Sequence, residues 1–278
     1  SSPGASVRMA VIGCGQMGTL HAKKLAAMPD IDLVAVCDTN EVRSERLADE
    51  VGCDAEVDYM NLGGEIDAVV VATNPGSHGE ICDGFLRNHI HVLVEKPIAM
   101  SESDAKHMTG LAEDNRLVLQ VGHIERFNPI FRRIVEIIEF PFQIEVHRHS
   151  RVEFRQQEVD VVLDLMIHDI DMVLSIARTD VSNITGSGNR DTAIAELKFI
   201  DGSVAVLHAN RKAATRTRTW CVNDEKHYLM TEEDYLTEEL RHFIECVSDG
   251  KQPRVGGKEG SAALKVALEI SRQIREAE

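Results

Sequence analysis

The sequence predicts two domains, an α/β domain built on a parallel sheet and then an α+β domain with a mostly antiparallel sheet. Over the first 120 residues, short apolar runs alternate with amphipathic stretches of helical period, which is the pattern of βαβ units. After about residue 122 the pattern changes to strand-rich segments separated by turns. We therefore expect domains over residues 7–122 and 123–278, and we allow for the last helix packing back on the first domain.

In the first domain, each predicted strand is followed by a predicted helix. The apolar runs are short and flanked by turn residues, as expected for strands buried between two layers of helices. Ser101, three residues before Asp104, is typical of a helix N-terminus because its hydroxyl accepts a backbone N–H. The predicted strands are Val7–Ile12, Leu33–Cys37, Ala68–Ala72, Val92–Glu95 and Val118–Val121, and the predicted helices are Met17–Met28, Glu41–Val51, Gly79–Asn88 and Glu102–Asn115.

The second domain is expected to begin with one helix and to end with two. Between them we predict a strand at Gln143–Arg151, a strongly apolar helix at Val159–Ile176, and strands separated by turns at Gly186–Asn189 and Asp201–Gly202. The closing helices are predicted near Glu232–Val247 and Gly260–Arg275. The stretch from Thr185 to Glu232 is short for a full set of strands, and its continuity is weakest where Asn223 meets Asp224.

Composition limits the partners of this chain. A formal net charge of −16 argues against a nucleic-acid partner, because phosphate binding calls for a broad positive surface. No apolar run approaches the roughly 20 residues of a membrane-spanning helix, so we expect no membrane partner and a cytoplasmic location. The six cysteines form no C-x-x-C pair, which fits reduced thiols. A run of cations from Arg211 to Arg218 without an acid forms either a local anion site or a solvated strand face.

A glycine-rich turn lies between the first predicted strand and the first predicted helix. Gly13, Gly15 and Gly18 form the pattern G-x-G-x-x-G. The first glycine permits the tight turn, the second lets the backbone approach a pyrophosphate, and the third allows close packing of helix on strand. The helix N-terminus then offers unpaired N–H groups to the anion. The motif predicts a Rossmann-type dinucleotide site.

The second strand ends in a carboxylate that strengthens this prediction. Asp38 follows Gly18 by 20 residues, where an aspartate can accept hydrogen bonds from the ribose hydroxyls of the adenosine half. The same carboxylate would repel a 2′-phosphate, and neither Thr39 nor Asn40 offers a cation. Arg43, one turn into the next helix, is the residue that might otherwise bind such a phosphate. We therefore expect NAD as the cofactor, with NADP as the alternative.

Two further groups of residues have the chemistry of an active site. Lys96 follows a strand end, where it can donate to a substrate oxygen and stabilise a developing alkoxide, or can simply be a surface lysine. Asp164 and His168 stand four residues apart on the apolar helix, with Asp171 continuing the stripe. A buried histidine with a nearby carboxylate is suited to general-base catalysis, although a structural pair is the alternative. Metal binding by these three residues is also possible, but we expect no metal.

Taken in order and spacing, these motifs resemble the Gfo/Idh/MocA oxidoreductase family over nearly the whole chain from Val7. The resemblance implies an open-faced sheet in the second domain that pairs subunits into a homodimer or homotetramer. It also implies that Lys96, Asp164 and His168 are the catalytic set, with His168 as the general base. The residues expected at the cofactor are Gly13, Gly15, Gln16, Met17, Gly18, Asp38, Thr73, Asn74, Pro75, His78, Glu95 and Lys96.

The segments Val121–Pro129 and Asp160–Asp171 resemble more narrowly the members that oxidise the 3-hydroxyl of UDP-N-acetylglucosamine. Sister enzymes that oxidise free sugars or inositol share the same core, so their substrates remain alternatives. A sugar-sensing or NAD-sensing regulator on this scaffold is a second alternative, and a C=N or C=C reductase is a third. The residues expected to contact the sugar-type substrate are His123, Arg126, Asn128, Arg151, Asp164 and His168.

Overall fold

The computed structural model describes residues 6–64, 66–151 and 159–277, and it divides into two compact units. The first unit comprises the described residues up to Gly122 together with Leu236–Ser261. The second comprises His123–Tyr235 and the chain from Ala262 onward. The segment Leu236–Ser261, which the sequence analysis placed in the second domain, therefore belongs by its contacts to the first unit.

Sheet A of the first unit is parallel and has the strand order β3-β2-β1-β4-β5-β6. The order reverses between β1 and β4, which is the doubly wound arrangement of a Rossmann domain. Loops after these two strands lead away in opposite directions, and ligands of such sheets bind at this switch point. The strands are β1 (Val7–Ile12), β2 (Ile31–Cys37), β3 (Asp54–Glu56), β4 (Ala68–Val71), β5 (His91–Glu95) and β6 (Leu119–Gly122).

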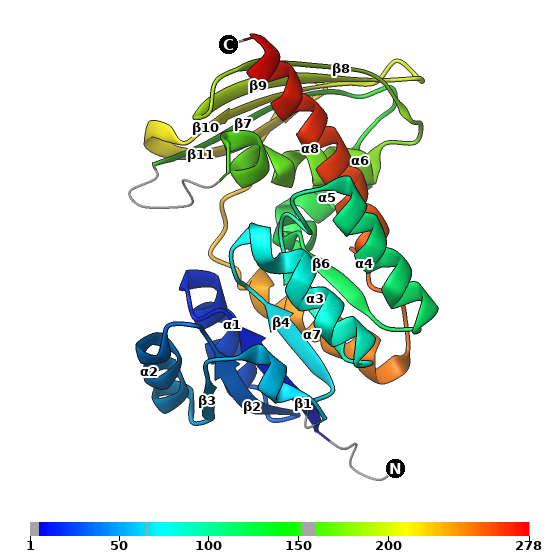
Figure 1. Ribbon diagram of the computed structural model, residues 1–278. Helices are drawn as coiled ribbons and strands as arrows, with labels where there is room; N and C mark the ends of the chain where they lie inside the picture. Colours follow the sequence, from blue (N-terminus) through cyan, green and yellow to red (C-terminus); the bar gives the residue numbers. More distant parts are fainter. Residues whose placement is uncertain (1–5, 65, 152–158, 278) are drawn as a thin grey trace. The chain divides into compact units, whose positions relative to one another are not determined.

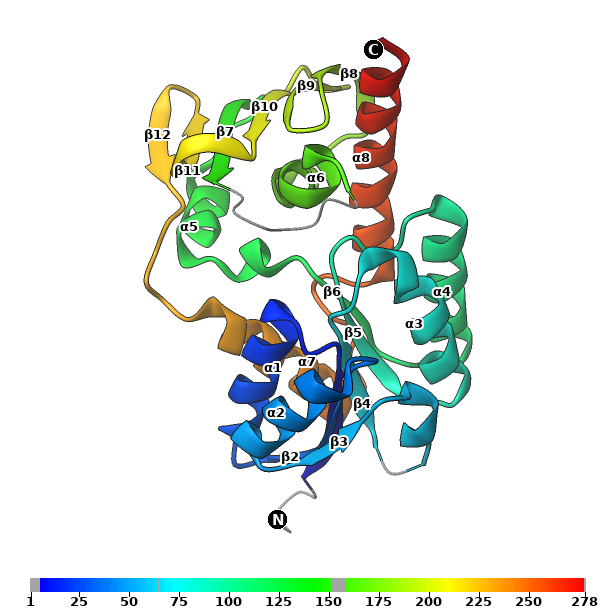
Figure 2. The same ribbon diagram turned by 60° about the vertical axis from the view of Figure 1, so that its left-hand side comes forward.

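Helices cover both faces of sheet A. In Figure 2, α1 and α2 lie on one side of the sheet, and α3 and α4 lie on the other. Because both faces are covered, the central strands are apolar throughout, and all four residues of β4 are fully buried. The cap predicted at Ser101 is present, since its hydroxyl accepts the N–H of Asp104 at 3.1 Å. The helices are α1 (Gln16–Ala26), α2 (Glu41–Val51), α3 (His78–Arg87) and α4 (Glu102–Asp114).

The late segment of the first unit is held against β6. The Gln120 side chain donates to the backbone oxygen of Glu239 at 3.1 Å, and the N–H of Val121 donates to the oxygen of Val255 at 2.9 Å. This segment contains most of α7 (Tyr235–Asp249) and the start of α8 (Gly257–Ala277), and α8 continues into the second unit. The long-range backbone bond explains why the segment joins the first unit although it is distant in sequence.

Sheet B of the second unit has the order β12-β11-β7-β10-β9-β8. Its neighbouring strands are antiparallel except for β7 and β10, which run parallel. The fold class predicted from sequence, a Rossmann domain plus an α+β domain with a mostly antiparallel sheet, is therefore confirmed. The strands are β7 (Gln143–Arg151), β8 (Val181–Gly188), β9 (Thr192–Phe199), β10 (Val204–Asn210), β11 (Lys212–Val222) and β12 (Glu225–Tyr228).

One face of sheet B is packed and the other is open. Along β7, Ile144 and Val146 are buried while Glu145 and His147 lie on the opposite face, as the alternation of a strand requires. Figure 1 shows α6 and α8 on one side of this sheet. The helical elements of the unit are α5 (Pro129–Ile137), a π-helical segment at Val162–Met166, α6 (Ile167–Ile176) and the later part of α8.

Three expectations about local structure were wrong. The break suspected between Asn223 and Asp224 is a tight hairpin joining β11 to β12, with φ of 47° and 70° at the two turn residues. Positive φ at both positions is the type I′ pattern that matches strand twist. The turn expected to begin at Gly186 starts later, because β8 continues to Gly188. The short strand β3 was not predicted.

Gly186 is needed for packing rather than for a turn. A Cβ at this position would lie 2.9 Å from a methyl group of Ile270 on α8, so the glycine allows the helix to approach β8 closely. Although the region from residue 185 to 232 is short, it contains the end of β8 and all of β9, β10, β11 and β12. Sheet B therefore has six strands. Within the part of the chain that the structure describes, no helix is both long and apolar enough to cross a membrane.

Candidate functional site

The glycine turn after β1 has the geometry that the sequence motif predicts. Gly13 has φ of +97°, and a Cβ there would lie 2.5 Å from the oxygen of Ala72. A Cβ on Gly18 would lie 1.7 Å from the oxygen of Gly13, so helix α1 can pack this closely only with glycine. Around Gly15 a Cβ would meet nothing within 4 Å among the described residues, which leaves this exposed backbone open to an approaching anion.

Helix α1 begins directly after this turn, with Gly15 as its N-cap. Gln16 is exposed and Met17 is half-buried in the first turn, where backbone N–H groups have no partner within the helix. The first turn holds no acidic residue, so its positive dipole end is not neutralised by the chain itself. The turn and the helix start therefore fit the pyrophosphate of a dinucleotide.

Asp38, at the end of β2, is bonded to the glycine turn. One carboxylate oxygen accepts the N–H of Cys14 at 2.8 Å, and the other accepts the N–H of Asn40 at 2.8 Å. The sequence motif places this carboxylate beside the turn but does not reveal the direct bond. Each oxygen has further lone-pair capacity, so a half-buried Asp38 can still accept hydroxyl groups of a ribose.

The loop after β4 is fastened to the loop after β5 by His78. Its buried ring lies between two carbonyl oxygens, with Nδ1 2.8 Å from Pro97 and Nε2 3.1 Å from Thr73. Burial lowers the pKa of His78, and this effect exceeds the opposing one of the two carbonyls. We therefore interpret His78 as a residue that positions this loop rather than one that touches a ligand. In the same loop Thr73 is half-buried, Asn74 exposed and Pro75 buried.

Lys96 stands where the sequence analysis expected it, immediately after the carboxyl end of β5, and it is half-buried. The preceding Glu95 is buried, and its Oε1 is 2.6 Å from Nε2 of His21 on α1. Burial acts to raise the pKa of Glu95, but the His21 hydrogen bond and the charges of His21 and Lys96 hold it below its usual value. The strand end that carries Lys96 is thus fixed by a buried hydrogen bond between Glu95 and His21.

In the second unit, Asp164 and His168 lie on consecutive helical elements. Asp164 is buried in the π-helical segment, 3.7 Å from Nη1 of Arg211, and His168 is half-buried in the first turn of α6. The expected regular helix is therefore wrong at this point, because the spacing from Asp164 to His168 crosses from π to α geometry. Single π-helical turns inside helices are frequent at functional sites. Asp171 is buried, 3.7 Å from Nη1 of Arg126.

The remaining residues proposed for substrate contact differ in their surroundings. Asn128 is buried, and its side chain is used within the chain: it caps α5 and donates to Glu125 and to the oxygen of Leu229. His123 is buried, Arg126 is half-buried and Arg151 is exposed at the end of β7. We therefore keep Arg151 as a residue with the exposure and charge to meet a ligand, note that the Arg126 side chain is only 10% exposed and faces Asp171, and assign Asn128 to structure.

Comparisons with known proteins identify relatives of this chain. A family model described as an oxidoreductase family with an NAD-binding Rossmann fold, Gfo/Idh/MocA, matches residues 7–123. The chain is 32% identical over 212 residues to UDP-N-acetylglucosamine 3-dehydrogenase of Acidithiobacillus ferrooxidans, with 74% of this chain and 67% of that protein covered. The chain belongs to the Gfo/Idh/MocA oxidoreductase family.

Similarity to Gfo/Idh/MocA proteins extends over both units. The solved structure of the Acidithiobacillus dehydrogenase has a TM-score of 0.91 and 26% identity, with 98% of this chain and 99% of that chain covered. The chain is also 25% identical over 323 residues to myo-inositol 2-dehydrogenase of Thermotoga maritima, with 97% of each covered. The resemblance inferred from sequence motifs is confirmed.

Glu239 joins His21 and Glu95 in a buried cluster that was not predicted from the sequence. Glu239 of α7 is fully buried, and neither carboxylate oxygen has a hydrogen-bond partner among the described residues. Ligand atoms of His21, Glu95 and Glu239 lie within 4.8 Å of one another. Burial and the charge of Glu95 raise the pKa of Glu239 well above its usual value. The 2.6 Å contact of His21 with Glu95 is a hydrogen-bond length, so we interpret the cluster as proton-sharing rather than metal-binding.

We predict that Glu239→Gln raises the melting temperature, and by more at about pH 8 than at about pH 5. A carboxyl group whose folded-state pKa is raised gives stability that is complete below its unfolded pKa of about 4.3 and is lost as pH rises through the folded pKa. The glutamine amide of the variant does not ionise, so it causes no such loss of stability as pH rises. Thermal unfolding followed by dye fluorescence at both pH values measures the difference, with exposed Glu245→Gln on the same helix as control. An equal gain at both pH values would contradict the assignment.

The cation run from Arg211 to Arg218 does not form an isolated anion site. Arg211 bonds to Asp191 at 2.8 Å, and Lys212 forms an ion pair with the same carboxylate. Arg218 lies 3.0 Å from Glu125. Three of the four cations thus pair with acids of their own unit, which argues against the local anion site that was one of the two alternatives.

A buried charge network links β7 to the helix of His168, and its members were not singled out in the sequence. Arg148 is 3% exposed and donates to both carboxylate oxygens of Asp169, at 2.6 and 2.9 Å, and to Glu125 at 3.0 Å. The indole of Trp220 also donates to Asp169, at 3.0 Å. Burial acts to lower the pKa of Arg148, but the two carboxylates raise it above its usual value. The residue next to His168 is therefore fixed by three hydrogen bonds.

Proposed function

We propose that this chain is an NAD-dependent dehydrogenase that oxidises a secondary hydroxyl group of a sugar or a sugar nucleotide. The observation that carries the proposal is the similarity to two dehydrogenases of carbohydrate-like alcohols in a chain that contains Lys96, Asp164 and His168. A sensing protein would have no need for all three side chains. The test is formation of NADH from a defined alcohol by the purified full chain.

NAD is favoured over NADP by the surroundings of Asp38. Its carboxylate sits beside the glycine turn, where the adenosine ribose binds in Rossmann domains, and it would repel a 2′-phosphate. Asn40 is used as the cap of α2, accepting the N–H of Arg43 at 3.2 Å. Arg43 is exposed and is the cation that follows Asp38 most closely in sequence. It is therefore the residue that would bind a 2′-phosphate if the preference changed to NADP.

Asp38→Arg is predicted to weaken NAD binding by about tenfold or more and to improve NADP binding, because it exchanges repulsion of the 2′-phosphate for attraction. Isothermal titration with NAD and NADP measures both affinities without any substrate. Asp114→Arg, at an exposed acid at the C-terminal end of α4 in the same unit, is the control and is expected to leave the ratio unchanged. An unchanged ratio in Asp38→Arg would mean that the ribose contact has been misplaced.

In the proposed mechanism, His168 accepts the proton of the substrate hydroxyl as the carbon is oxidised. The role proposed for Lys96 is to donate a hydrogen bond to a substrate oxygen and to stabilise the charge that develops during oxidation. Asp164, held near Arg211, orients the substrate or the imidazole. The bound nicotinamide supplies the electrophilic carbon that accepts the hydride. Glycine residues 13, 15 and 18 and Asp38 would hold the cofactor, as their geometry fits it.

The substrate that we propose first is UDP-N-acetylglucosamine, with reaction at its 3-hydroxyl. Its support is the 32% identity to a dehydrogenase of that name. Free inositols are the second candidate, since myo-inositol 2-dehydrogenase aligns over 97% of this chain at 25% identity. Because Arg211, Lys212 and Arg218 pair with acids, the charge of this run by itself gives little support to a site for the diphosphate of a UDP-sugar.

The experiment follows NADH absorbance with NAD and a panel of UDP-N-acetylglucosamine, UDP-glucose, myo-inositol and free hexoses. An aminotransferase with glutamate is added to remove a ketone product and draw an unfavourable equilibrium forward. A signal with the UDP-sugar alone supports the first substrate, and a signal with an unactivated polyol alone supports the second. If none of these compounds yields NADH while NAD still binds, the result would favour a sugar-sensing or NAD-sensing regulator.

We also propose that copies of the chain pair through the open face of sheet B into a homodimer or homotetramer in the cytoplasm. Ile194 of β9 is 48% exposed on this face, which is high for a large apolar side chain. Light scattering coupled to gel filtration measures the mass in solution. Ile194→Glu should shift an oligomer toward monomer if this face pairs.

A further inference from the structure

The open face of sheet B brings together histidines that are far apart in sequence. Strands β7 and β10 pair in parallel, with His208 directly opposite His147 and Asn210 opposite His149. Glu145 lies two residues before His147 and therefore points to the same face. All these residues belong to the second unit and stand on paired strands rather than on loops.

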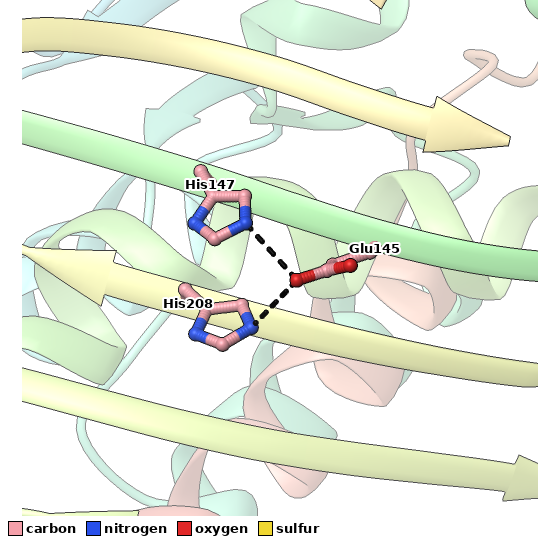
Figure 3. A group of neighbouring side chains, drawn as sticks. All are labelled: Glu145, His147 and His208. Atoms are coloured by element: carbon pink, nitrogen blue, oxygen red, sulfur yellow. Dashed lines mark hydrogen bonds and ion pairs between the residues drawn. The ribbon is translucent and has the colours of Figure 1, made fainter. Parts of the chain in front are cut away.

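The side chains of this cluster converge on one carboxylate oxygen, as Figure 3 shows. Nε2 of His147 is 3.1 Å from Oε1 of Glu145, and Nε2 of His208 is 3.4 Å from the same oxygen. The two imidazole rings stack with centroids 4.3 Å apart and planes 11° from parallel, so both nitrogens point the same way. The three potential ligand atoms lie within 4.8 Å of one another.

We propose that Glu145, His147 and His208 bind a divalent transition-metal ion, with Zn²⁺ as the expected ion. Imidazole nitrogen and carboxylate oxygen are ligands that Zn²⁺ accepts at about 2.0–2.2 Å. Two ligands at that distance from a tetrahedral ion are separated by about 3.3–3.6 Å. The two nitrogen–oxygen separations here, 3.1 and 3.4 Å, are close to that value. A three-ligand set leaves a fourth position for water or another donor.

Hydrogen bonding alone explains this arrangement less well. The His147 contact has an ordinary length for an N–H···O bond, but 3.4 Å for His208 is beyond the usual range of about 2.7–3.2 Å. Stacked imidazoles at this distance would repel each other if both were protonated. Each lone pair lies in its own ring plane and the planes are 11° from parallel, so one ring has to turn about its side-chain torsions for both nitrogens to bind one ion.

The proposal is independent of the dehydrogenase function and of the residues assigned to it. The sequence analysis considered a metal only at Asp164, His168 and Asp171, and these residues do not form a metal-capable group among the described residues. An ion at Glu145, His147 and His208 would connect β7 to β10 and stabilise the folded second unit by mass action.

Isothermal titration of ZnCl₂ into the chelator-treated full chain tests the site, with Co²⁺ absorbance as a second readout of nitrogen and oxygen ligation. We expect one site per chain, a rise in melting temperature with Zn²⁺, and a loss of affinity of about 100-fold or more in His147→Gln and in His208→Gln. The matched control is His149→Gln, on the same strand and face but with its ring centroid 5.7 Å from that of His147. It should keep affinity within about threefold.

Glu145→Gln tests the carboxylate separately and should weaken Zn²⁺ binding about tenfold or more, because it removes the charged ligand. Circular dichroism and the metal-free melting temperature establish that each variant is folded. Absence of a site in the unaltered chain would overturn the proposal. So would unchanged affinity in His147→Gln or His208→Gln, or an equal loss in His149→Gln, since the ligands would then lie elsewhere.

Discussion

The variant His168→Ala is expected to lose turnover by about a hundredfold to ten-thousandfold while binding NAD as tightly as the unaltered chain. This range is what a positioned general base contributes to a proton transfer. His168 lies in the first turn of α6 in the second unit, whereas the residues that fit the dinucleotide lie in the first. Removal of the imidazole should therefore affect the chemical step and leave cofactor affinity unchanged.

Three measurements separate this role from a structural one. Turnover is followed by NADH absorbance with whichever alcohol of the panel reacts, NAD affinity by calorimetry, and folding by the melting temperature. His227→Ala on β12 is the matched control, because it removes a half-buried histidine of the same unit that has no place in the proposed chemistry. Full turnover in His168→Ala would remove this residue as the base, and equal losses in both variants would indicate a structural effect.

The elements of the first unit were predictable because hydrophobic period and covalent geometry act locally there. Val7–Ile12 and Glu41–Val51 were predicted with the bounds that the structure has. Parallel strands covered on both faces give apolar runs, and helices between them give a helical period. β3 (Asp54–Glu56) was not predicted, because a three-residue strand with two acidic residues has neither an apolar run nor a helical period.

In the second unit the errors arose where tertiary packing overrides local signals. Gly186 was interpreted as a turn residue, but it lies within β8 because Ile270 of α8 packs against it. The π-helical segment before α6 has no signature in a run of apolar residues, so the spacing of Asp164 and His168 suggested a regular helix. A glycine or a polar pair in a sequence shows that a position is special without showing which constraint makes it so.

The same distinction applies to the candidate site. The roles of Gly13, Gly18 and Asp38 follow from one contiguous motif, and the structure gives each a local geometric reason. By contrast, Glu239 meets Glu95 only through the fold, across more than a hundred residues of chain. A buried acid within the apolar stripe of a helix was the available signal, and its partner could not be inferred from spacing.

Arg148→Met is expected to reduce the free energy of unfolding of the second unit by about 3–5 kcal/mol, because it leaves two buried carboxylates without their shared cation. Glu125 would keep Arg218 at 3.0 Å, and Asp169 would keep only the Trp220 indole among the bonds described above. Trp220 is the single tryptophan of the chain, so its fluorescence in a urea titration reports this region directly. Arg272→Met, which breaks an exposed ion pair on α8, is the control and should have little effect.

The pH dependence of this loss distinguishes removal of charge from loss of packing. Burial acts to raise the pKa of Glu125, but the charges of Arg148 and Arg218 lower it below its usual value. A depressed folded-state pKa gives stability that is present above the unfolded pKa, about 4.3, and is lost as pH falls through the folded pKa. Without Arg148 the pKa of Glu125 should rise, so stability should fall less steeply below about pH 5 than in the unaltered chain. Parallel pH profiles would mean that Arg148 stabilises the unit through packing of its side chain rather than through its charge.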